Sequence, residues 1–289
     1  MDGFDLDIDA VERVGDCASA LVPVNGINIM TGAVPDNGAS SRLDPPTAHA
    51  IGQELSRASA DDAYPAQLAV GVTSQRLVRI SVAGRAVHRA ILRSFASRGC
   101  RPDRDGLAAA AGQHDLNTLL AELHDHDVIR LDDRCKIRAA YPFSAVPTAH
   151  VVAIRQGPTV YAMCAIDALG MATMLNEDIA ISSRDPQTGT PIKIDIRGGQ
   201  PVWEPSETVV FVGAYQTASA VTESEGGDQP DKACAVAAAD RCCGVMNFFA
   251  SADSADAWQR ANRDVRGQIL SQRQALRLGD DIFGNLLRT

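Results

Sequence analysis

The chain of 289 residues is long enough for one large domain or two ordinary ones, and 45% hydrophobic with 22% charged residues is typical of a globular protein. A formal net charge of -9 argues against nucleic acid or an anionic membrane as the main partner. No stretch is long and uncharged enough to span a bilayer, because Asp167 and Glu177 interrupt the best candidate. The acidic N-terminal sequence lacks the basic and then apolar pattern of a signal peptide, so we expect a cytoplasmic protein.

Residues 1–80 show no clear hydrophobic periodicity. The stretch at 31–50 is rich in Gly, Pro, Ser and Asn, which is typical of a loop or linker. We therefore expect an N-terminal extension that is partly flexible.

Residues 81–145 predict three helices followed by a β-hairpin. The first helix is expected at 84–99 and stops at Gly99. Its apolar face consists of Val87, Ile91, Leu92 and Phe95. Two shorter helices are expected at 103–113 and 115–127, and two strands joined at Asp132-Asp133 follow within 128–143. This order of elements is that of a winged-helix module.

Many winged-helix modules bind DNA, but the charges here argue against that role. The third helix segment carries Asp115, Glu122, Asp125 and Asp127 and contains no lysine or arginine. A surface that faces phosphates needs the opposite charge. The triplet His124-Asp125-His126 could suggest a metal site, yet a solvated polar cluster at a helix end is the simpler interpretation.

Residues 146–289 predict an α+β domain built on a mainly antiparallel sheet with flanking helices. A strand, a turn and an apolar helix are expected within 150–175, and an alternating hairpin within 178–199. Further strands are expected at 207–214 and 244–249. Two helices are expected at 254–264 and 274–287.

Seven cysteines occur, at positions 17, 100, 135, 164, 234, 242 and 243. A disulfide framework is not expected in a chain of this size without an export signal. No Cys-x-x-Cys pair occurs, and no His/Cys cluster has the spacing of a zinc site. The thiols therefore indicate reduced chemistry or the binding of a soft metal ion.

One thiol lies close to a carboxylate inside an apolar segment, "YAMCAIDALG" at 161–170. If this segment is helical, Cys164 and Asp167 project from one face within reach of each other. An aspartate in such a segment needs a partner or a function, although a carboxylate that caps a backbone amide would be sufficient. A buried cysteine is ordinary by itself.

Several segments taken together resemble the organomercurial (alkylmercury) lyase family. That family carries Cys-x-x-Asp on a helix and a second catalytic cysteine in a Cys-Cys-x-Val-x-Phe-Phe context, similar to "YAMCAIDALG" and to "DRCCGVMNFFAS" at 240–251. The stretch "ISSRDPQTGTPIKIDI" at 181–196 is similar to the family's Ser-Ser…Thr-Gly-x-Pro hairpin. The family's N-terminal helical module is also similar to residues 84–143, and the resemblance as a whole covers 84–289.

The resemblance implies that Cys164, Asp167 and Cys242 are the catalytic residues and that they hold the mercury. Cys243 would then be a non-catalytic neighbour. A further family cysteine in the hairpin is missing, and the sequence has Arg184 and Asp185 there.

The implied reaction is protonolysis of a carbon–mercury bond in a small organomercury substrate, by a catalytic domain at 146–289. Two soft thiolates would push electron density onto mercury, and Asp167 would relay a proton to the departing carbon. Burial would raise the pKa of Asp167 and keep that proton available near neutral pH. No organic cofactor is implied; small thiols would be co-reactants, and Hg(II) would pass to an acceptor such as mercuric reductase.

Three other functions stay open. A non-catalytic carrier of copper or mercury could use the same two thiols and would need no proton donor. The fold could also serve other thiol chemistry. Acyl transfer of the Cys-His type is less favoured, because no histidine lies near either cysteine motif in sequence, although His150 could approach in space.

Overall fold

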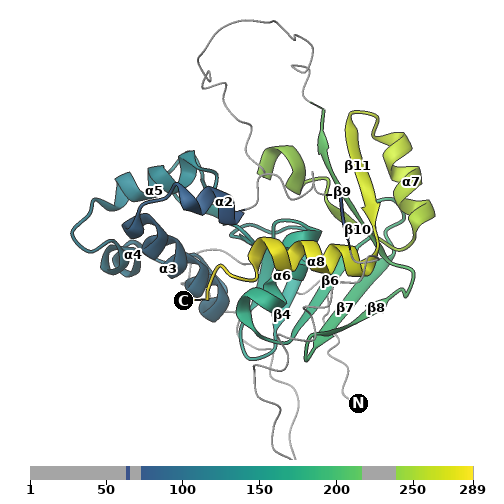
Figure 1. Cartoon of the computed structure of the whole chain (residues 1–289), viewed down its shortest axis with the longest axis horizontal. Coiled ribbons are helices and arrows are strands. Elements are labelled where there is room, and N and C mark those ends of the chain that lie inside the picture. Colours follow the sequence, from purple (N-terminus) through teal and green to yellow (C-terminus); the bar gives the residue numbers. More distant parts are fainter. Residues whose placement is uncertain (1–62, 66–72, 217–238, 289) are drawn as a thin grey trace, which may run out of the picture.

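The computed structural model describes residues 63–65, 73–216 and 239–288 (Figure 1). The predicted N-terminal extension therefore lies largely outside the described residues. The elements of the N-terminal part are α2 (Thr73–Val78), α3 (Val82–Arg98), α4 (Arg104–Ala111), α5 (Leu116–Asp125), β1 (Ile129–Leu131), β2 (Ile137–Ala140) and β3 (Phe143–Ser144).

The second half contains both strands and helices, with four consecutive strands after its first helix. Its elements are β4 (His150–Ile154), β5 (Thr159–Ala162), α6 (Ala165–Leu175), β6 (Ile179–Arg184), β7 (Pro191–Arg197), β8 (Gln200–Glu204), β9 (Val209–Tyr215), the π-helix η4 (Ala239–Cys243), β10 (Asn247–Phe249), α7 (Ala252–Ala261), β11 (Val265–Leu270) and α8 (Gln272–Phe283). The expected elements are present, and β5, β8 and β11 are strands that the sequence analysis did not separate or find.

Local sequence explains where the N-terminal helices begin and end. The side chains of Ser81, Asp103 and Asp115 accept backbone N–H groups at the starts of α3, α4 and α5. Gly99 ends α3 in the left-handed conformation with φ 76°, where a glycine is favoured. The expected apolar face of α3 is fully buried. The order of three helices and a hairpin agrees with the prediction, while the winged-helix assignment and the domain boundaries stay predictions.

The strands form two antiparallel sheets. The larger has the order β1-β2-β3-β5-β4-β6-β7-β8, and the smaller has the order β10-β9-β11. The larger sheet runs from the predicted helical module into the second half through the pairs β2–β3 and β3–β5. The expectation of an α+β protein with a mainly antiparallel sheet is confirmed.

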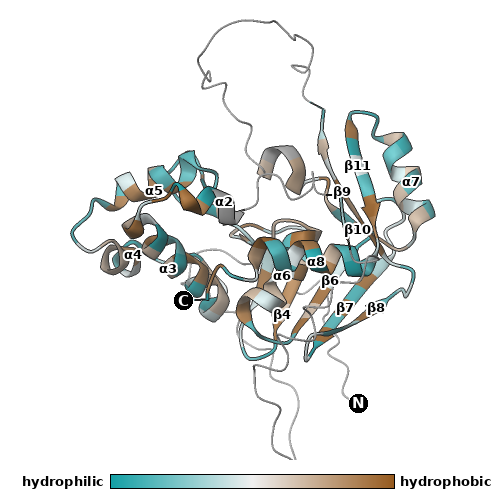
Figure 2. Ribbon diagram, in the orientation of Figure 1, coloured by the Kyte–Doolittle hydropathy of each residue, from teal (hydrophilic) through white to brown (hydrophobic). Residues whose placement is uncertain are grey.

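Helix α6 packs against β4, β5 and β6 of the larger sheet, and α8 packs along α6 and also contacts β9 and β11 of the smaller sheet (Figure 1). The backbones of α6 and α8 approach closely, since a Cβ on Gly279 would lie 2.9 Å from the backbone N of Gly170. Figure 2 shows β4 and β6 as largely hydrophobic strands in this region, in agreement with the buried side chains of Val152, Ile179 and Ile181. Within the described part of the chain, no helix combines the length and the apolar character needed to cross a membrane.

Asp185, at the position where the family resemblance lacks a cysteine, is 1% exposed and joins two distant segments. Its Oδ1 accepts the N–H groups of Gln187 and Thr188 at 2.7 and 3.1 Å, which shapes the β6–β7 turn. Its Oδ2 accepts Ala250 N–H at 2.9 Å and the Ser254 hydroxyl at 2.6 Å. The carboxylate therefore ties the hairpin to the segment between β10 and α7.

These hydrogen bonds determine the charge state of Asp185. Burial alone would raise its pKa, but the hydrogen bonds from Ser254, Ala250, Gln187 and Thr188 outweigh burial and lower the pKa below the ordinary value. A lowered pKa stabilises the fold above the unfolded-state pKa of about 3.9, and this contribution is lost as pH falls through the folded-state value.

We expect Asp185→Ala to lower the free energy of unfolding by about 2–4 kcal/mol at pH 7, because four donors lose their charged acceptor. Asp185→Asn should destabilise less and should lose part of the stability difference between pH 7 and pH 3. Urea denaturation at both pH values measures these effects.

Asp195→Asn is the matched control, because it removes only an exposed ion pair of 2.6 Å with Arg197. Its effect should stay within about 1 kcal/mol. An Asp185→Ala protein as stable as this control would show that the carboxylate does not anchor the hairpin.

Candidate active site

Cys164 lies at the junction between β5 and α6. The sequence analysis placed it within the helix, but it is the N-cap residue, with extended backbone angles (φ -154°, ψ 180°). Its Sγ accepts the backbone N–H of Asp167 at 3.5 Å, in the manner of a capping side chain. The Asp167 side chain therefore lies beside Cys164, as expected. The contact joins the N-cap residue to the first turn of α6, whereas the sequence analysis expected two residues within one helix.

The two side chains are directly hydrogen-bonded. The Cys164 thiol donates to Oδ2 of Asp167 at 2.5 Å, and both residues are buried, with exposures of 2% and 4%. Few water molecules can therefore compete for this contact. The short distance allows a proton to pass between the thiol and the carboxyl group.

The Cys243 thiol completes this site. Ligand atoms of Cys164, Asp167 and Cys243 all lie within 4.8 Å of one another, and all three residues are buried. In the described ranges, this is the only group of three or more His, Cys, Asp or Glu side chains close enough to share a metal ion. The two thiols can bind a soft metal ion, and the carboxyl group places an oxygen donor beside that ion.

Burial controls protonation in the cluster. It raises the pKa of Asp167 to about 7, against the lowering effect of the Cys164 hydrogen bond. It also raises the pKa of Cys164 to about 11. The expected upward shift for Asp167 is confirmed in direction, so this carboxyl group can hold a proton near neutral pH.

The π-helix η4 places the adjacent cysteines against the start of α6. After η4 the chain turns sharply, because Val245 N–H and Met246 N–H both donate to the Cys242 carbonyl, at 3.0 and 3.1 Å. Met246 O then accepts Ala165 N–H at 3.1 Å, at the first turn of α6. This backbone contact brings η4 and the Cys164 cap together, although they are separated by nearly eighty residues of sequence.

Cys242, which the resemblance assigned as the second catalytic cysteine, does not belong to the group of three. It is half-buried, and a hydrogen bond from Cys243 lowers its pKa. A signal for the other register is present in the sequence. The family pattern Cys-Cys-x-Val-x-Phe-Phe has one residue between the valine and the first phenylalanine, whereas two residues lie between Val245 and Phe248 here. If the pattern is aligned on Phe248 instead of on Val245, its first cysteine falls on Cys243.

Other residues considered from sequence lie apart from this group. His150 is buried, its Nδ1 lies 3.0 Å from Ser183 Oγ, and it does not belong to the group formed by Cys164, Asp167 and Cys243. None of Cys164, Cys242, Cys243 and the exposed Cys135 forms a disulfide. Cys100 is disulfide-bonded, which the expectation of reduced cysteines missed.

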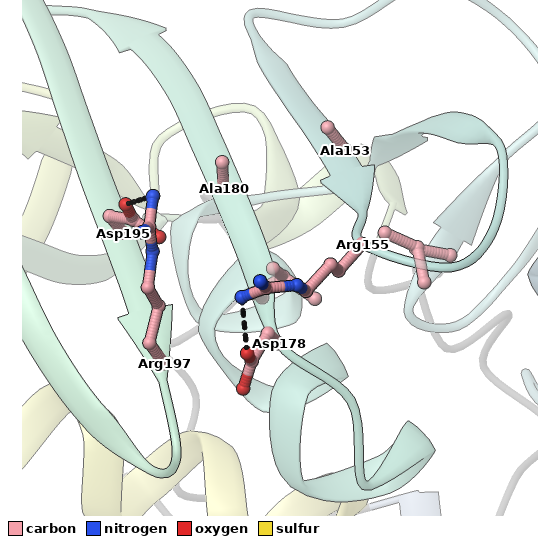
Figure 3. Close-up of a pocket in the computed structure, with 8 residues that line it drawn as sticks. Ala153, Arg155, Asp178, Ala180, Asp195 and Arg197 are labelled. Carbon is pink, nitrogen blue, oxygen red and sulfur yellow. Dashed lines mark hydrogen bonds and ion pairs between the residues drawn. The ribbon is translucent and has the colours of Figure 1, made fainter. Parts of the chain in front are cut away.

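A separate cavity of about 220 Å³ lies over β4, β6 and β7 (Figure 3). Its charged side chains form two internal pairs, Arg155 with Asp178 at 2.9 Å and Arg197 with Asp195 at 2.6 Å. Its lining residues include none of the cysteine cluster. Because these charges are already matched, the cavity offers no evident recognition chemistry.

Comparisons with known proteins agree with the geometry. The family model described as alkylmercury lyase matches residues 143–225 and 227–284. The alkylmercury lyase of Bacillus cereus is 25% identical over 151 residues, which are 52% of this chain and 60% of that protein. The alkylmercury lyase of Staphylococcus epidermidis is 28% identical over 151 residues, 52% of this chain and 61% of that protein. The match thus spans about 60% of the length of these relatives.

The fold is similar to that of a solved structure, the mercury-bound form of MerB2. The TM-score is 0.59 at 23% identity, and the alignment covers 77% of this chain and all of that one. At this identity the likeness shows the fold. The family match rests on the part of the chain that contains all three residues of the buried cluster, Cys164, Asp167 and Cys243. Through its residues 143–284, the chain belongs to the alkylmercury lyase family.

Proposed function

We propose that this protein is an organomercurial lyase, which cleaves a carbon–mercury bond and releases a hydrocarbon and Hg(II). The observation that carries this proposal is the buried group of two thiols and one carboxyl, with Cys164 Sγ 2.5 Å from Asp167 Oδ2. No organic cofactor has a role in this chemistry. The substrate is a small organomercury compound, which arrives as the adduct of a small thiol.

The first step is thiol exchange at mercury. The Cys164 sulfur bonds to mercury, the small thiolate leaves, and the Cys164 proton leaves with it or moves to Asp167. The hydrogen bond between Cys164 and Asp167 supplies a path for that proton. Soft thiolate ligands suit mercury for the same reason that they suit Cu(I).

The second step breaks the carbon–mercury bond. The Cys243 sulfur bonds to mercury, and the carbon takes a proton as it leaves with the bonding electron pair. Asp167 delivers this proton and regains one from the Cys243 thiol, so Asp167 ends the step protonated. A carboxyl group with a pKa of about 7 is a suitable general acid at neutral pH.

The product is Hg(II) held by two thiolates beside the protonated carboxyl group of Asp167. Small thiols remove it, and a mercuric reductase is a suitable acceptor for the toxic ion. The cycle needs Cys164 and Cys243 in the reduced form, because oxidised cysteines could not bind mercury, and neither of the two forms a disulfide.

A non-catalytic carrier of mercury or copper is the second candidate, because two thiols alone suffice to bind a soft ion. The position of Asp167 favours the lyase. A carrier has no need for a carboxyl group with a raised pKa, buried and hydrogen-bonded to one of its ligands. Incubation with phenylmercury and excess small thiol separates the two: a lyase liberates benzene, and a carrier binds the compound without releasing it.

The register of the second thiol gives a specific prediction. Cys243→Ser should lower the rate of benzene release at least roughly a thousandfold, because one thiolate remains on mercury. Cys242→Ser should retain activity within about tenfold. Gas chromatography of the released benzene measures both, and Cys135→Ser, which alters an exposed thiol, is the control.

The opposite result, with Cys242→Ser inactive and Cys243→Ser active, would restore the register that the family resemblance suggested. It would also show that η4 rearranges when mercury binds.

Asp167→Asn keeps the side-chain volume and removes the acid. We expect it to bind phenylmercury through both cysteines but to release benzene roughly a hundredfold more slowly, the low end for loss of a positioned general acid. Single-turnover measurements separate binding from release. Unchanged turnover in Asp167→Asn would mean that water or another group supplies the proton.

A further inference from the structure

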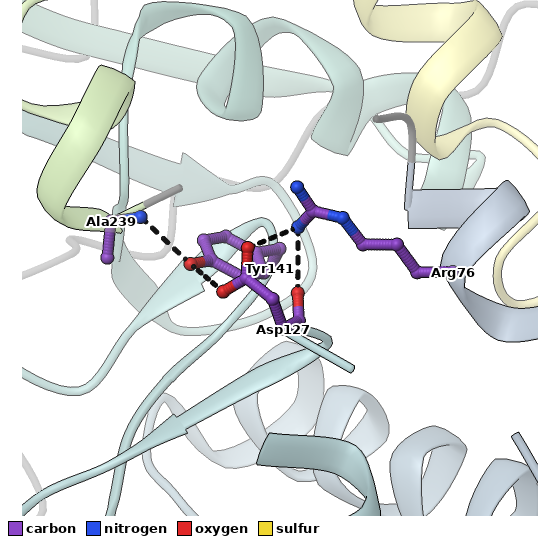
Figure 4. Close-up of polar contacts among 4 residues, drawn as sticks. All are labelled: Arg76, Asp127, Tyr141 and Ala239. Carbon is purple, nitrogen blue, oxygen red and sulfur yellow. Dashed lines mark hydrogen bonds and ion pairs between the residues drawn. The ribbon is translucent and has the colours of Figure 1, made fainter. Parts of the chain in front are cut away.

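The π-helix η4 that carries the cysteine pair is joined to the N-terminal helices by a line of polar contacts (Figure 4). The backbone N–H of Ala239, the first residue of η4, donates to the Tyr141 hydroxyl at 3.0 Å. The first N–H groups of any helix lack partners within the helix. The Tyr141 hydroxyl therefore acts as a side-chain cap for η4.

The Tyr141 hydroxyl is itself held in one orientation. Its proton is donated to Oδ1 of Asp127 at 3.1 Å, which leaves a lone pair directed at Ala239 N–H. Tyr141 follows β2 and is only 3% exposed, so its ring is fixed by packing. A hydroxyl group that both donates and accepts in a buried position has little freedom to rotate.

Asp127 is fixed by Arg76 in turn. Nη1 of Arg76 lies 2.7 Å from Oδ2 of Asp127 and also donates to the Asp127 carbonyl at 2.8 Å. Asp127 occupies the left-handed region with φ 52°, directly after α5, and the contact with Arg76 helps to hold this uncommon conformation. Both side chains are mostly shielded, with exposures of 25% and 20%, which strengthens the pair relative to a fully exposed one.

We propose that Tyr141 is a positioning residue, and that the line Arg76–Asp127–Tyr141 fixes η4 so that the Cys243 thiol meets Cys164 and Asp167. Tyr141 touches neither substrate nor mercury in this role. It acts through the backbone of η4, and the helix α2 contributes to the site through Arg76. This inference rests on the proposed function and extends it to the geometry of the second thiol.

The charge of Arg76 agrees with this arrangement. Burial raises the pKa of Asp167 overall, but Arg76 is among the groups that oppose this rise, so the positive charge of Arg76 acts on the cluster. A displaced thiol would reduce the rate more than it would reduce simple binding, because bond cleavage depends on placement within about an ångström.

Tyr141→Phe tests the role, since it keeps the ring and removes only the hydroxyl. We expect retention of Hg(II) against a competing small thiol to fall about tenfold, and benzene release per mercury-binding site to fall at least about tenfold at unchanged KM. Tyr64→Phe is the matched control, because it removes a tyrosine hydrogen bond of 2.9 Å to Asp281 outside this line. It should leave both quantities unchanged.

Asp127→Asn is the second variant and serves if Tyr141→Phe does not fold. It weakens the pair with Arg76 and should shift both quantities in the same direction. In a double-variant cycle, Asp127→Asn should add little to Tyr141→Phe, because the two residues act along one line.

Wild-type retention of Hg(II) and wild-type benzene release in folded Tyr141→Phe would overturn the inference, and so would full additivity in the cycle. Failure of the proposed function would look different. In that case the wild-type protein itself would release no benzene, while the mercury-retention comparison would still report whether Tyr141 positions the thiol.

Discussion

The hydrogen bond from the Cys164 thiol to the Asp167 carboxyl is the interaction on which the site depends. It forms because a cysteine caps α6 and an aspartate occupies the first turn, where a carboxylate is ordinarily favoured. Burial of the carboxyl group changes the balance and favours the neutral acid. A common capping arrangement thereby places the Cys164 thiol beside a carboxyl group that can donate a proton.

The second thiol depends on longer-range structure. Cys243 lies on a π-helix, a rare element that is frequent at functional sites, and two independent contacts hold its ends. Tyr141 caps its start, and the turn through Met246 docks its end on α6. Asp185 fastens the next segment, after β10, to the β6–β7 hairpin. A carboxylate with four donors thus occupies the hairpin position where the family resemblance led us to expect a cysteine.

Sequence periodicity was sufficient for the helices and for most strands, because their apolar faces are continuous and their caps are recognisable. Periodicity did not predict β8 and β11, because these segments, Gln200–Glu204 and Val265–Leu270, mix proline, glycine and charged residues. They are extended because β8 pairs with β7 and β11 pairs with β9. Cys164 and Asp167 were found from the family resemblance and their spacing. The choice between Cys242 and Cys243 depends on how one extra residue before Phe248 is accommodated, and this is a property of the π-helix and its turn rather than of any local propensity.

The proposed mechanism requires Cys164 and Cys243 to hold mercury together, with Asp167 beside them. Mercury X-ray absorption spectroscopy tests it directly, on Cys242→Ser and Cys243→Ser proteins that each carry one equivalent of Hg(II) in thiol-free buffer. We expect two sulfur neighbours around mercury in Cys242→Ser and only one protein sulfur in Cys243→Ser. Two sulfur neighbours in Cys243→Ser, with one in Cys242→Ser, would overturn the mechanism and assign Cys242 as the second ligand.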